Sequence, residues 1–314
     1  MVRAFLFPGQ GSQSIGMGRA LAENFPAARN VFQEIDEALK QKLSKLMWEG
    51  PDSELVLTEN AQPAIMAASI AVVRVLESEA GLNFARHVRL VAGHSLGEYS
   101  ALSAIGALAL TDAARLLRTR GKAMQQAVPP GEGAMSALLG IELADAEAAA
   151  AEASAQGGVC VVANDNAPGQ VVISGSREAV QRAGEMAKAK GARRVMALSV
   201  SAPFHCPLMQ PAAEKMRESL SEVTIRPPSV PIVSNVTASE ADEPETIRRL
   251  LVDQVTLRVR WRESVLKFRG FGISTTVEAG GNRVLTGMVK RIDPELQVIA
   301  IDTPQDIEAF AKVL

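Results

Sequence analysis

Ser95 stands in a setting that could make it a nucleophile. It occupies the centre of a Gly-x-Ser-x-Gly run at 93–97, directly after the mostly apolar segment 88–92, which we expect to be a buried strand. In a strand–turn–helix arrangement the two glycines permit a cramped backbone, and the serine hydroxyl is exposed where the helix starts. The free N–H of Leu96 can then point toward a developing oxyanion. The run predicts a nucleophile, although a tight turn with a serine cap has the same pattern.

A serine hydroxyl needs a general base, and histidine is the usual one because its pKa lies near working pH. The chain has three histidines. His94 adjoins Ser95, so its side chain should point away from the serine, and His87 lies among arginines and is expected at the surface. His205 remains, in a proline-bounded loop at 201–207, and loops after strands carry function in α/β folds. We therefore predict His205 as the base; a packed loop histidine is the alternative.

The sequence does not reveal which group orients this histidine. A hydrolase-type triad would place an acid between the serine and the histidine in chain order. Asp112, Asp145 and Asp165 lie in that interval, but none has a distinctive setting. A backbone carbonyl could orient the histidine instead. Cys206 adjoins His205, which is a poor geometry for a base and its nucleophile.

The glycine-rich segment 7–18 raises the alternative of a phosphate loop. It lacks the Gly-Lys-Ser/Thr ending of a P-loop and does not fit the dinucleotide fingerprint. Glycines that let backbone N–H groups face an acyl oxygen explain the segment better. Methionines such as Met124, Met135 and Met288 are expected in the core or the pocket lining rather than in redox chemistry.

Strands that alternate with helices must position these residues. Such alternation predicts a mostly parallel sheet covered on both faces. Pro63 is expected to open its helix, since proline is tolerated in a first turn. Buried strands are expected at 4–7, 88–92, 231–234, 274–278 and 298–301, and helices at about 19–46, 63–78, 97–104, 111–127, 244–255, 261–268 and 284–291.

A smaller unit is expected to interrupt this alternation after the Pro-Pro-Gly breaker at 129–131. The β-α-β-β-α-β order of its segments is the ferredoxin-like order. We therefore expect residues 1–130 and 199–314 to form a large α/β catalytic domain, with 131–198 inserted as a subdomain. In the insert, strands are expected at 134–139, 159–163, 171–174 and 194–198, helices at 143–155 and 177–190, and a turn at 164–169.

Composition excludes several classes of protein. The 314 residues carry 33 Lys and Arg against 35 Asp and Glu, and a net charge of −2 argues against nucleic-acid binding. The two cysteines, Cys160 and Cys206, form no disulfide framework, which favours a reducing cytoplasm. We identify no apolar stretch near 18 residues and no signal peptide, so we expect no membrane contact.

Several separated motifs, taken in order, resemble one known family. They are similar to those of the malonyl-CoA:acyl carrier protein transacylases of fatty-acid synthesis, and the resemblance covers essentially the whole chain. The motifs are Phe-Pro-Gly-Gln-Gly-Ser-Gln at 7–13, Gly-His-Ser-Leu-Gly-Glu-Tyr at 93–99, Arg-Gly-Lys-Ala-Met-Gln at 120–125, Asn-Asp-Asn-Ala-Pro-Gly-Gln at 164–170 and Phe-His at 204–205.

The resemblance implies Ser95 as the nucleophile and His205 as its base. It implies that the backbone carbonyl of Gln254 orients this histidine in place of an acid. The backbone N–H groups of Gln10 and Leu96 would form the oxyanion hole. The family fold is a hydrolase-like α/β domain with a ferredoxin-like insert, which agrees with the pattern of elements.

The resemblance also implies that Arg120 binds the free carboxylate of a malonyl group. A planar guanidinium can hold a carboxylate through two parallel hydrogen bonds. From the residues alone, a solvated arginine in a basic helix is the simpler interpretation. The remaining pocket residues implied are His94, Met124, Asn164 and Phe204. A bulky ring at Phe204 would crowd a 2-methyl branch, which favours malonyl over methylmalonyl groups.

With the resemblance, these features predict a two-step transfer of a malonyl group from malonyl-CoA through a malonyl-serine, without metal or other cofactor. The resemblance implies acyl carrier protein as the acceptor and a monomeric enzyme. Ala167 departs from the serine often found in the family and affects a loop near the entrance. Lys190, Arg193 and Arg194 are candidate contacts for an acidic carrier.

Two alternative functions fit the same residues. A thioesterase or esterase would share the serine and histidine without the carboxylate clamp. A non-catalytic carrier-binding protein on the same fold is the other alternative.

Overall fold

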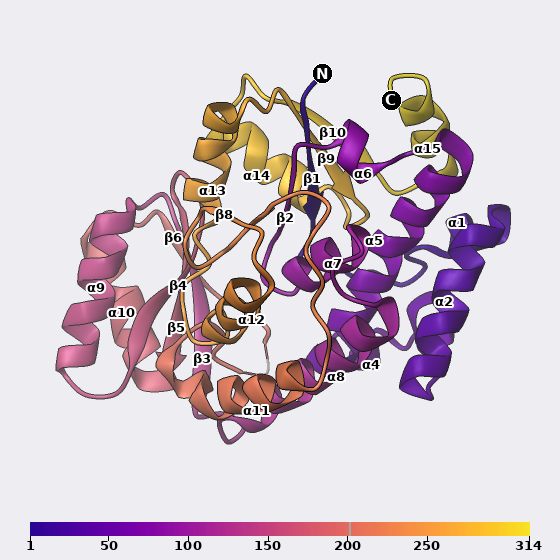
Figure 1. Ribbon diagram of the computed structural model, residues 1–314. Helices are drawn as coiled ribbons and strands as arrows, with labels where there is room; N and C mark the ends of the chain where they lie inside the picture. Colours follow the sequence, from indigo (N-terminus) through magenta and orange to yellow (C-terminus); the bar gives the residue numbers. More distant parts are fainter. Residues whose placement is uncertain (201) are drawn as a thin grey trace.

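The computed structural model describes residues 1–200 and 202–314; Ser201, the first residue of the predicted histidine loop, lies outside the described residues. The strands form two separate sheets (Figure 1). One sheet has the order β10-β9-β1-β2-β7-β8, and the other has the order β4-β5-β3-β6. The strands of the larger sheet are β1 (Arg3–Phe7), β2 (Leu90–Gly93), β7 (Ile232–Val233), β8 (Glu240–Ala241), β9 (Thr275–Ala279) and β10 (Gln297–Ile301).

The larger sheet is parallel except at one edge. β1 pairs in parallel with β2 and β9, β2 with β7, and β9 with β10, whereas β8 lies antiparallel to β7. The prediction of a mostly parallel sheet is therefore confirmed. The short edge strand β8 was not predicted, because two residues carry no periodic signal.

Helices cover both faces of this sheet. Along β1, Phe5 and Phe7 belong to one hydrophobic cluster, whereas Ala4 and Leu6 belong to a second one. Successive residues of a strand point to opposite faces, so one strand serves both clusters. The first cluster includes α5 (Thr58–Ala80), α7 (Gly97–Ala104) and α8 (Leu110–Gln126), and the second includes α13 (Trp261–Phe268) and α14 (Val284–Ile292).

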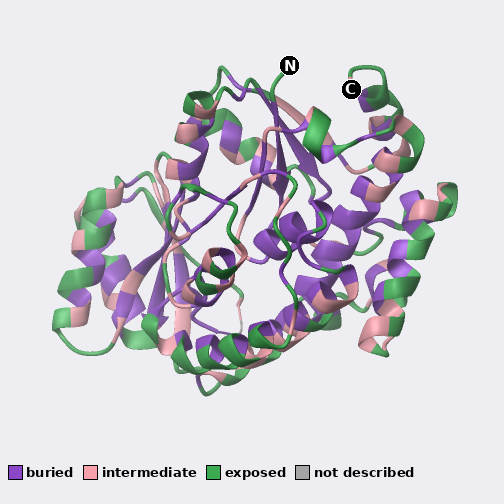
Figure 2. Cartoon of the chain, in the orientation of Figure 1, coloured by how far each residue is buried: buried purple, intermediate pink, exposed green. Residues whose placement is uncertain are grey.

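Helix α5 differs from its prediction in two ways. It begins at Thr58, so Pro63 lies inside the helix instead of opening it. It is also the one helix, within residues 1–200 and 202–314, that is long and apolar enough to cross a membrane by length and composition. The expectation of no such stretch was therefore wrong. The apolar window is 83% buried inside the fold, and Figure 2 shows α5 as mostly buried, as in a core helix.

The other helices pack mainly on the helices that cover the larger sheet. The single helix predicted at 19–46 is three helices, because Pro26 starts α2 and Lys40, with φ 50°, ends it in the left-handed conformation. Helices α11 and α15 were not predicted. The remaining bounds are α1 (Arg19–Asn24), α2 (Pro26–Leu39), α3 (Leu43–Glu49), α4 (Asp52–Leu55), α6 (Phe84–His87), α11 (Gln210–Ser221), α12 (Pro244–Asp253) and α15 (Pro304–Ala311), with 3-10 turns η1 (Pro207–Met209) and η2 (Arg269–Phe271).

The smaller sheet is antiparallel and has the ferredoxin-like strand order. Helices α9 and α10 pack on this sheet, at the left in Figure 1. The predicted turn at 164–169 is wrong for most of its length, because β4 continues to Ala167. The elements are β3 (Gly133–Leu139), α9 (Leu143–Ala155), β4 (Cys160–Ala167), β5 (Gln170–Ser176), α10 (Arg177–Ala189) and β6 (Arg194–Ala197).

Strand β4 connects the smaller sheet to the segment before α13. The N–H of Asp165 donates to the carbonyl of Val259 at 3.0 Å, and the N–H of Val259 donates to the carbonyl of Ala163 at 2.8 Å. The pairing of β4 with β5 is irregular on both sides of this bridge. The extended strand thus carries Asn164 and Asn166 to the pocket described below.

Candidate active site

The backbone around Ser95 turns too tightly for side chains at either glycine. A Cβ at Gly93 would lie 1.9 Å from the carbonyl carbon of Gly97, and one at Gly97 would lie 2.2 Å from the carbonyl oxygen of Phe7. Ser95 itself adopts φ 54°, a left-handed conformation that costs free energy for a non-glycine residue. The predicted strand–turn–helix arrangement is present, with β2 before the turn and α7 after it.

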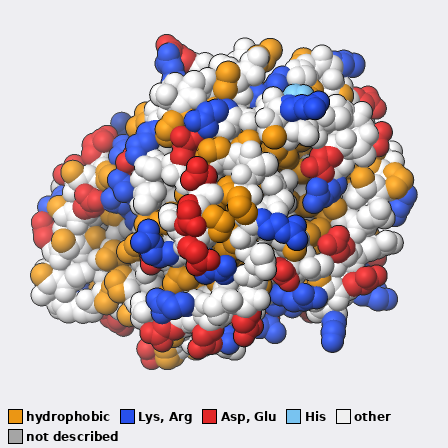
Figure 3. Space-filling view, viewed as in Figure 1, with side chains coloured by type: hydrophobic (Ala, Val, Ile, Leu, Met, Phe, Trp, Pro, Cys, Tyr) orange, Lys and Arg blue, Asp and Glu red, His pale blue; other side chains and the backbone are white. Residues whose placement is uncertain are grey.

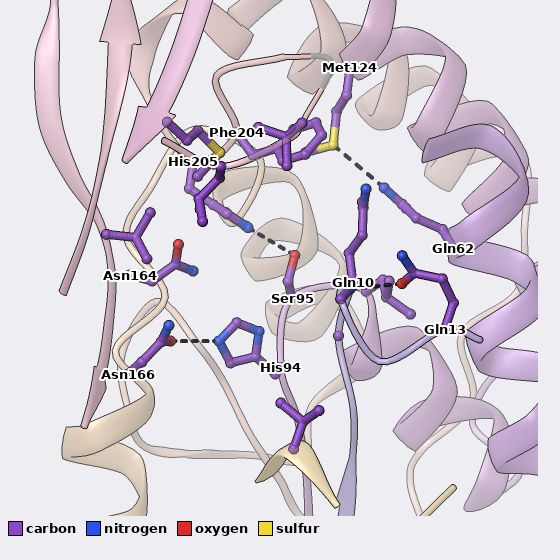
Figure 4. Close-up of a pocket in the computed structure, with 18 of the residues that line it drawn as sticks. Gln10, Gln13, Gln62, His94, Ser95, Met124, Asn164, Asn166, Phe204 and His205 are labelled. Atoms are coloured by element: carbon purple, nitrogen blue, oxygen red, sulfur yellow. Dashed lines mark hydrogen bonds between the residues drawn. The ribbon is translucent and has the colours of Figure 1, made fainter. Parts of the chain in front are cut away.

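Ser95 and His205 face each other across the pocket (Figure 4). The Ser95 Oγ lies 2.8 Å from Nε2 of His205, and Nδ1 of the same ring lies 2.8 Å from the backbone carbonyl oxygen of Gln254. His205 also adopts a left-handed conformation, with φ 56°. A carbonyl acceptor for Nδ1 leaves Nε2 as the proton acceptor toward the serine. The three groups have the arrangement of a triad whose third member is a carbonyl.

His205 is suited to act as a base. It is buried, and burial together with the charge of Arg120 lowers its pKa from 6.5 to about 3, against the hydrogen bond from the ring to Gln254. The imidazole is therefore neutral across the physiological range. A neutral Nε2 at hydrogen-bond distance from a hydroxyl can take its proton during attack.

The guanidinium of Arg120 reaches the serine from α8. Its Nη1 donates to Oε1 of Gln62 at 2.9 Å, and its Nη2 donates to Oε1 of Gln254 at 2.8 Å and to Oγ of Ser95 at 3.1 Å. The side chain is fully buried, and no carboxylate forms an ion pair with it among the described residues. Its hydrogen-bond partners among the described residues are two amides and a hydroxyl, all neutral, and a buried charge with such partners favours an anion brought by a ligand.

The loop after β1 lines the same pocket as Ser95. Its shape is fixed by a hydrogen bond from the Ser12 Oγ to the carbonyl of Gly9 at 2.5 Å and by one from the Gly11 N–H to Oε1 of Gln13 at 2.8 Å. Gln10 lies between these anchors and lines the same pocket as Leu96. The arrangement fits an oxyanion hole built from these two N–H groups.

His94 points away from the serine, as expected from the sequence. Its Nε2 lies 2.8 Å from Oδ1 of Asn166, and its ring meets Trp261 edge-on at 5.6 Å between centroids. Burial lowers the pKa of His94. A Cβ at Gly9 would lie 2.8 Å from the His94 Nδ1, so glycine is needed where the loop passes this ring.

One cavity of about 450 Å³ connects these groups. Every residue expected at the site lines it except Gln254, which lies behind the histidine and the arginine. Three further lining residues were not singled out as pocket residues from the sequence: Gln62 on α5, Asn166 on β4 and Leu285 on α14. The lining includes Gln10, Gln62, His94, Ser95, Leu96, Arg120, Met124, Met135, Asn164, Asn166, Leu198, Phe204, His205, Leu285 and Met288.

The other candidates from the sequence lie outside this cavity. Cys206 is buried, its Sγ lies 3.1 Å from the carbonyl oxygen of Pro203, and burial raises the pKa of its thiol, so it is no nucleophile. Asp165 pairs with Arg262 at 3.0 Å. His87 is half-buried and accepts a hydrogen bond from the Asn83 N–H.

The basic residues suggested for carrier binding lie at the margin of the smaller sheet. Arg193 and Arg194 are exposed, whereas Lys190 pairs with Glu152 at 2.8 Å. No group of three or more His, Cys, Asp or Glu side chains that could hold a metal ion occurs in the described part of the chain.

Comparisons of sequence agree with this geometry. The family model for the acyl transferase domain matches residues 4–293. A malonyl CoA-acyl carrier protein transacylase of Bacillus subtilis (strain 168) is 46% identical over 311 residues, which cover 99% of this chain and 96% of that protein. The protein of the same name from Escherichia coli (strain K12) is 44% identical over 306 residues, covering 98% of this chain and 97% of that protein.

Solved structures give the same result. An acyl-carrier-protein S-malonyltransferase from Bartonella henselae is 52% identical and superposes with a TM-score of 0.97, covering 100% of this chain and 99% of that one. A malonyl-transacylase in complex with a type II PKS acyl-carrier protein is 41% identical, with a TM-score of 0.96 and full coverage of both chains. The chain therefore belongs to the acyl transferase domain family and, within it, to the malonyl CoA-acyl carrier protein transacylases.

Proposed function

We propose that this enzyme moves a malonyl group from malonyl-CoA to the pantetheine thiol of acyl carrier protein, through a malonyl ester on Ser95. The names of its relatives support the substrates, and the carrier-bound relative supports the partner. The observation that carries the proposal is the position of Arg120. Its buried guanidinium lies 3.1 Å from the Ser95 hydroxyl, so one pocket holds both a nucleophile and a partner for a carboxylate.

In the first step, the Ser95 Oγ attacks the thioester carbonyl carbon while the His205 Nε2 takes the hydroxyl proton. The developing oxyanion is stabilised by the N–H groups of Gln10 and Leu96. Collapse of this intermediate breaks the carbon–sulfur bond, and the coenzyme A thiolate takes the proton from the imidazolium as it leaves. The enzyme then carries a malonyl ester and a neutral histidine.

In the second step, the pantetheine thiol gives its proton to His205 and its sulfur attacks the ester carbonyl. The carbon–oxygen bond breaks, and the Ser95 Oγ regains a proton from the imidazolium. The two substrates thus use the same pocket in turn, which gives ping-pong kinetics.

The geometry favours a transferase over a thioesterase or esterase. A hydrolase acting on simple acyl groups gains nothing from a buried arginine, whose desolvation costs several kcal/mol by general estimates for buried ions. A malonyl carboxylate held by Arg120 offsets that cost and fixes the acyl group. A non-catalytic carrier-binding protein would not need the 2.8 Å contact between Ser95 and His205.

We also propose that the enzyme acts as a cytoplasmic monomer and that residues 131–198 form a subdomain inserted between 1–130 and 199–314. Both cysteines are free, which supports a reducing compartment.

Figure 3 shows basic and acidic side chains interspersed over the face in view. We expect an acidic carrier to be recognised by a local group of basic side chains such as Arg193 and Arg194.

The proposal is tested by incubating the protein with malonyl-CoA and the pantetheinylated carrier, then separating malonyl-carrier from free malonate. We expect malonyl-carrier as the main product, with little free malonate. Free malonate as the main product would indicate a thioesterase, and neither product would indicate a non-catalytic protein.

A further inference from the structure

Glu98 lies beneath the active site, on the first turn of α7, and the reaction described above assigns it no role. Its side chain is 2% exposed, and both carboxylate oxygens accept hydrogen bonds. Oε1 accepts from the backbone N–H of Asn235 at 2.5 Å, and Oε2 accepts from Nε2 of Gln254 at 2.6 Å. A buried carboxylate is costly unless it is paired and hydrogen-bonded in this way.

The two partners of Glu98 hold the serine. Oδ1 of Asn235 accepts from the Ser95 N–H at 2.7 Å, and its Nδ2 donates to the carbonyl of Gly93 at 2.6 Å. Nε2 of Gln254 also donates to the Ser95 carbonyl at 3.0 Å. Both backbone polar groups of Ser95 are thus bonded to side chains of residues that Glu98 contacts, Asn235 through its backbone N–H and Gln254 through its side chain. These bonds support the left-handed backbone that aims its hydroxyl at the histidine.

Gln254 also joins the other two groups of the site. Its side-chain Oε1 accepts from Arg120 at 2.8 Å, and its backbone carbonyl accepts from His205 at 2.8 Å. An amide has one donor end and one acceptor end, so fixing the first fixes the second. With Nε2 held by Glu98, the oxygen must face the guanidinium.

We propose that Glu98 is a positioning residue for malonyl transfer: by accepting hydrogen bonds on both oxygens, it fixes the amide orientation of Gln254 and so holds Arg120 against Ser95. The inference rests on the proposed function. Were the Gln254 amide reversed, its NH₂ would face the N–H groups of Arg120 and two sets of donors would meet. The guanidinium would then lose one of the two amide oxygens that keep it at the serine.

The ionised form of Glu98 is the one that fits these contacts. Each oxygen accepts a hydrogen bond from a donor, and a negative charge on the carboxylate strengthens both bonds. The charged group acting on it from α8 is Arg120, and Tyr99 is its titratable neighbour on α7. Burial raises the pKa of Glu98, whereas the two hydrogen bonds and the charge of Arg120 act against the rise.

The variant Glu98→Gln tests the proposal, because it keeps the shape and replaces one acceptor by a donor. We expect kcat/KM for malonyl-CoA to fall about 100-fold, as for a displaced catalytic group. The kcat/KM for acetyl transfer, which needs no carboxylate clamp, should fall only about tenfold. The selectivity for malonyl over acetyl groups therefore drops about tenfold. The KM for malonyl-CoA should rise, because Arg120 is the group released.

Glu278→Gln is the matched control. Glu278 is also a buried glutamate with two N–H donors, those of Leu285 and Thr286, but it contacts neither Gln254 nor Arg120. We expect this variant to lose thermal stability while its malonyl-to-acetyl selectivity stays that of the native enzyme. Melting temperatures of both variants identify any loss of folding.

The outcomes separate the two proposals. If the native protein transfers no malonyl group at all, the proposed function fails. If the native protein is active but Glu98→Gln keeps its selectivity, or if Glu278→Gln changes selectivity equally, Glu98 has only a structural role and the inference is overturned.

Discussion

The Nη2 of Arg120 donates a hydrogen bond to the Oγ of Ser95 at 3.1 Å. The group that would bind a substrate carboxylate therefore touches the nucleophile itself. A malonyl group is short enough to place its thioester carbon at the serine and its free carboxylate at the arginine. The contact gives a physical reason for selectivity between malonyl and acetyl groups, since only the first brings a charge for the guanidinium.

Arg120→Ala should abolish this selectivity. Loss of two charge-assisted hydrogen bonds costs about 3 kcal/mol, or roughly 100-fold in kcat/KM for malonyl-CoA. Acetyl transfer should be retained or increased, because the pocket then holds no unpaired charge. Steady-state rates with both thioesters provide the measurement. Arg115→Ala, an exposed arginine of the same helix, is the control and should leave both rates unchanged. An equal loss for both acyl groups would mean that Arg120 is structural.

The pH dependence should follow Glu98 rather than His205. The pKa of His205 is lowered to about 3, so this base stays neutral as the pH falls through 6.5. The pKa of Glu98 is raised from 4.5 to about 8, so its ionised form gains population as the pH rises through that value. We expect kcat/KM for malonyl-CoA to rise with pH up to about 8 in the native enzyme and to be flat there in Glu98→Gln. A limb near pH 6.5 in both enzymes would contradict these assignments.

Gly97→Ala should damage the fold at the serine. Its Cβ would lie 2.2 Å from the Phe7 carbonyl oxygen, a backbone atom that cannot move without shifting β1. We expect a loss of about 3 kcal/mol in stability, or roughly 4–5 °C in Tm for a chain of this length, by general estimates for overpacking. Gly287→Ala is the control: it lies within α14, its Cβ meets nothing within 4 Å, and it should be neutral or stabilising by up to about 1 kcal/mol. Equal melting curves for the two variants would refute the steric argument.

Phe204→Ser should admit a branched acyl group. The ring lines the cavity directly before His205 in the chain, and its removal frees volume beside the acyl carbon. We expect measurable transfer from methylmalonyl-CoA in this variant and none in the native enzyme. Phe204→Tyr keeps the bulk and serves as the control. If the serine variant stays inactive on methylmalonyl-CoA, the exclusion of branched groups arises from another wall of the pocket.

The features that could be predicted from the sequence are local in the chain. The turn around Ser95 follows from two glycines and a preceding, mostly apolar run, and each strand of the larger sheet except β8 was predicted from a short local segment. The smaller sheet was predicted because its elements follow one another in the chain. The predicted start of α5 was wrong because residues 58–62, polar apart from Ala61, give no apolar pattern before Pro63 and are nevertheless helical.

The features that could not be predicted depend on residues far apart in the chain. Gln62 reaches Arg120 over 58 positions, and Asn235 reaches Ser95 over 140. Amides such as these carry no charge or periodicity that would single them out in a sequence. The sequence shows Glu98 only as part of the motif at 93–99. Its contacts could not be predicted, because its partners lie in the turn after β7 and at the end of α12. Only the packed structure brings these groups to the serine.

The most direct test of the account is the mass of the protein after brief mixing with malonyl-CoA in the absence of carrier. We predict an increase by one malonyl group, located by peptide fragmentation on Ser95 and lost when the pantetheinylated carrier is added. The variant Ser95→Ala should show no adduct. No adduct on the native protein, or an adduct on another residue such as Cys206, would contradict the malonyl-serine intermediate.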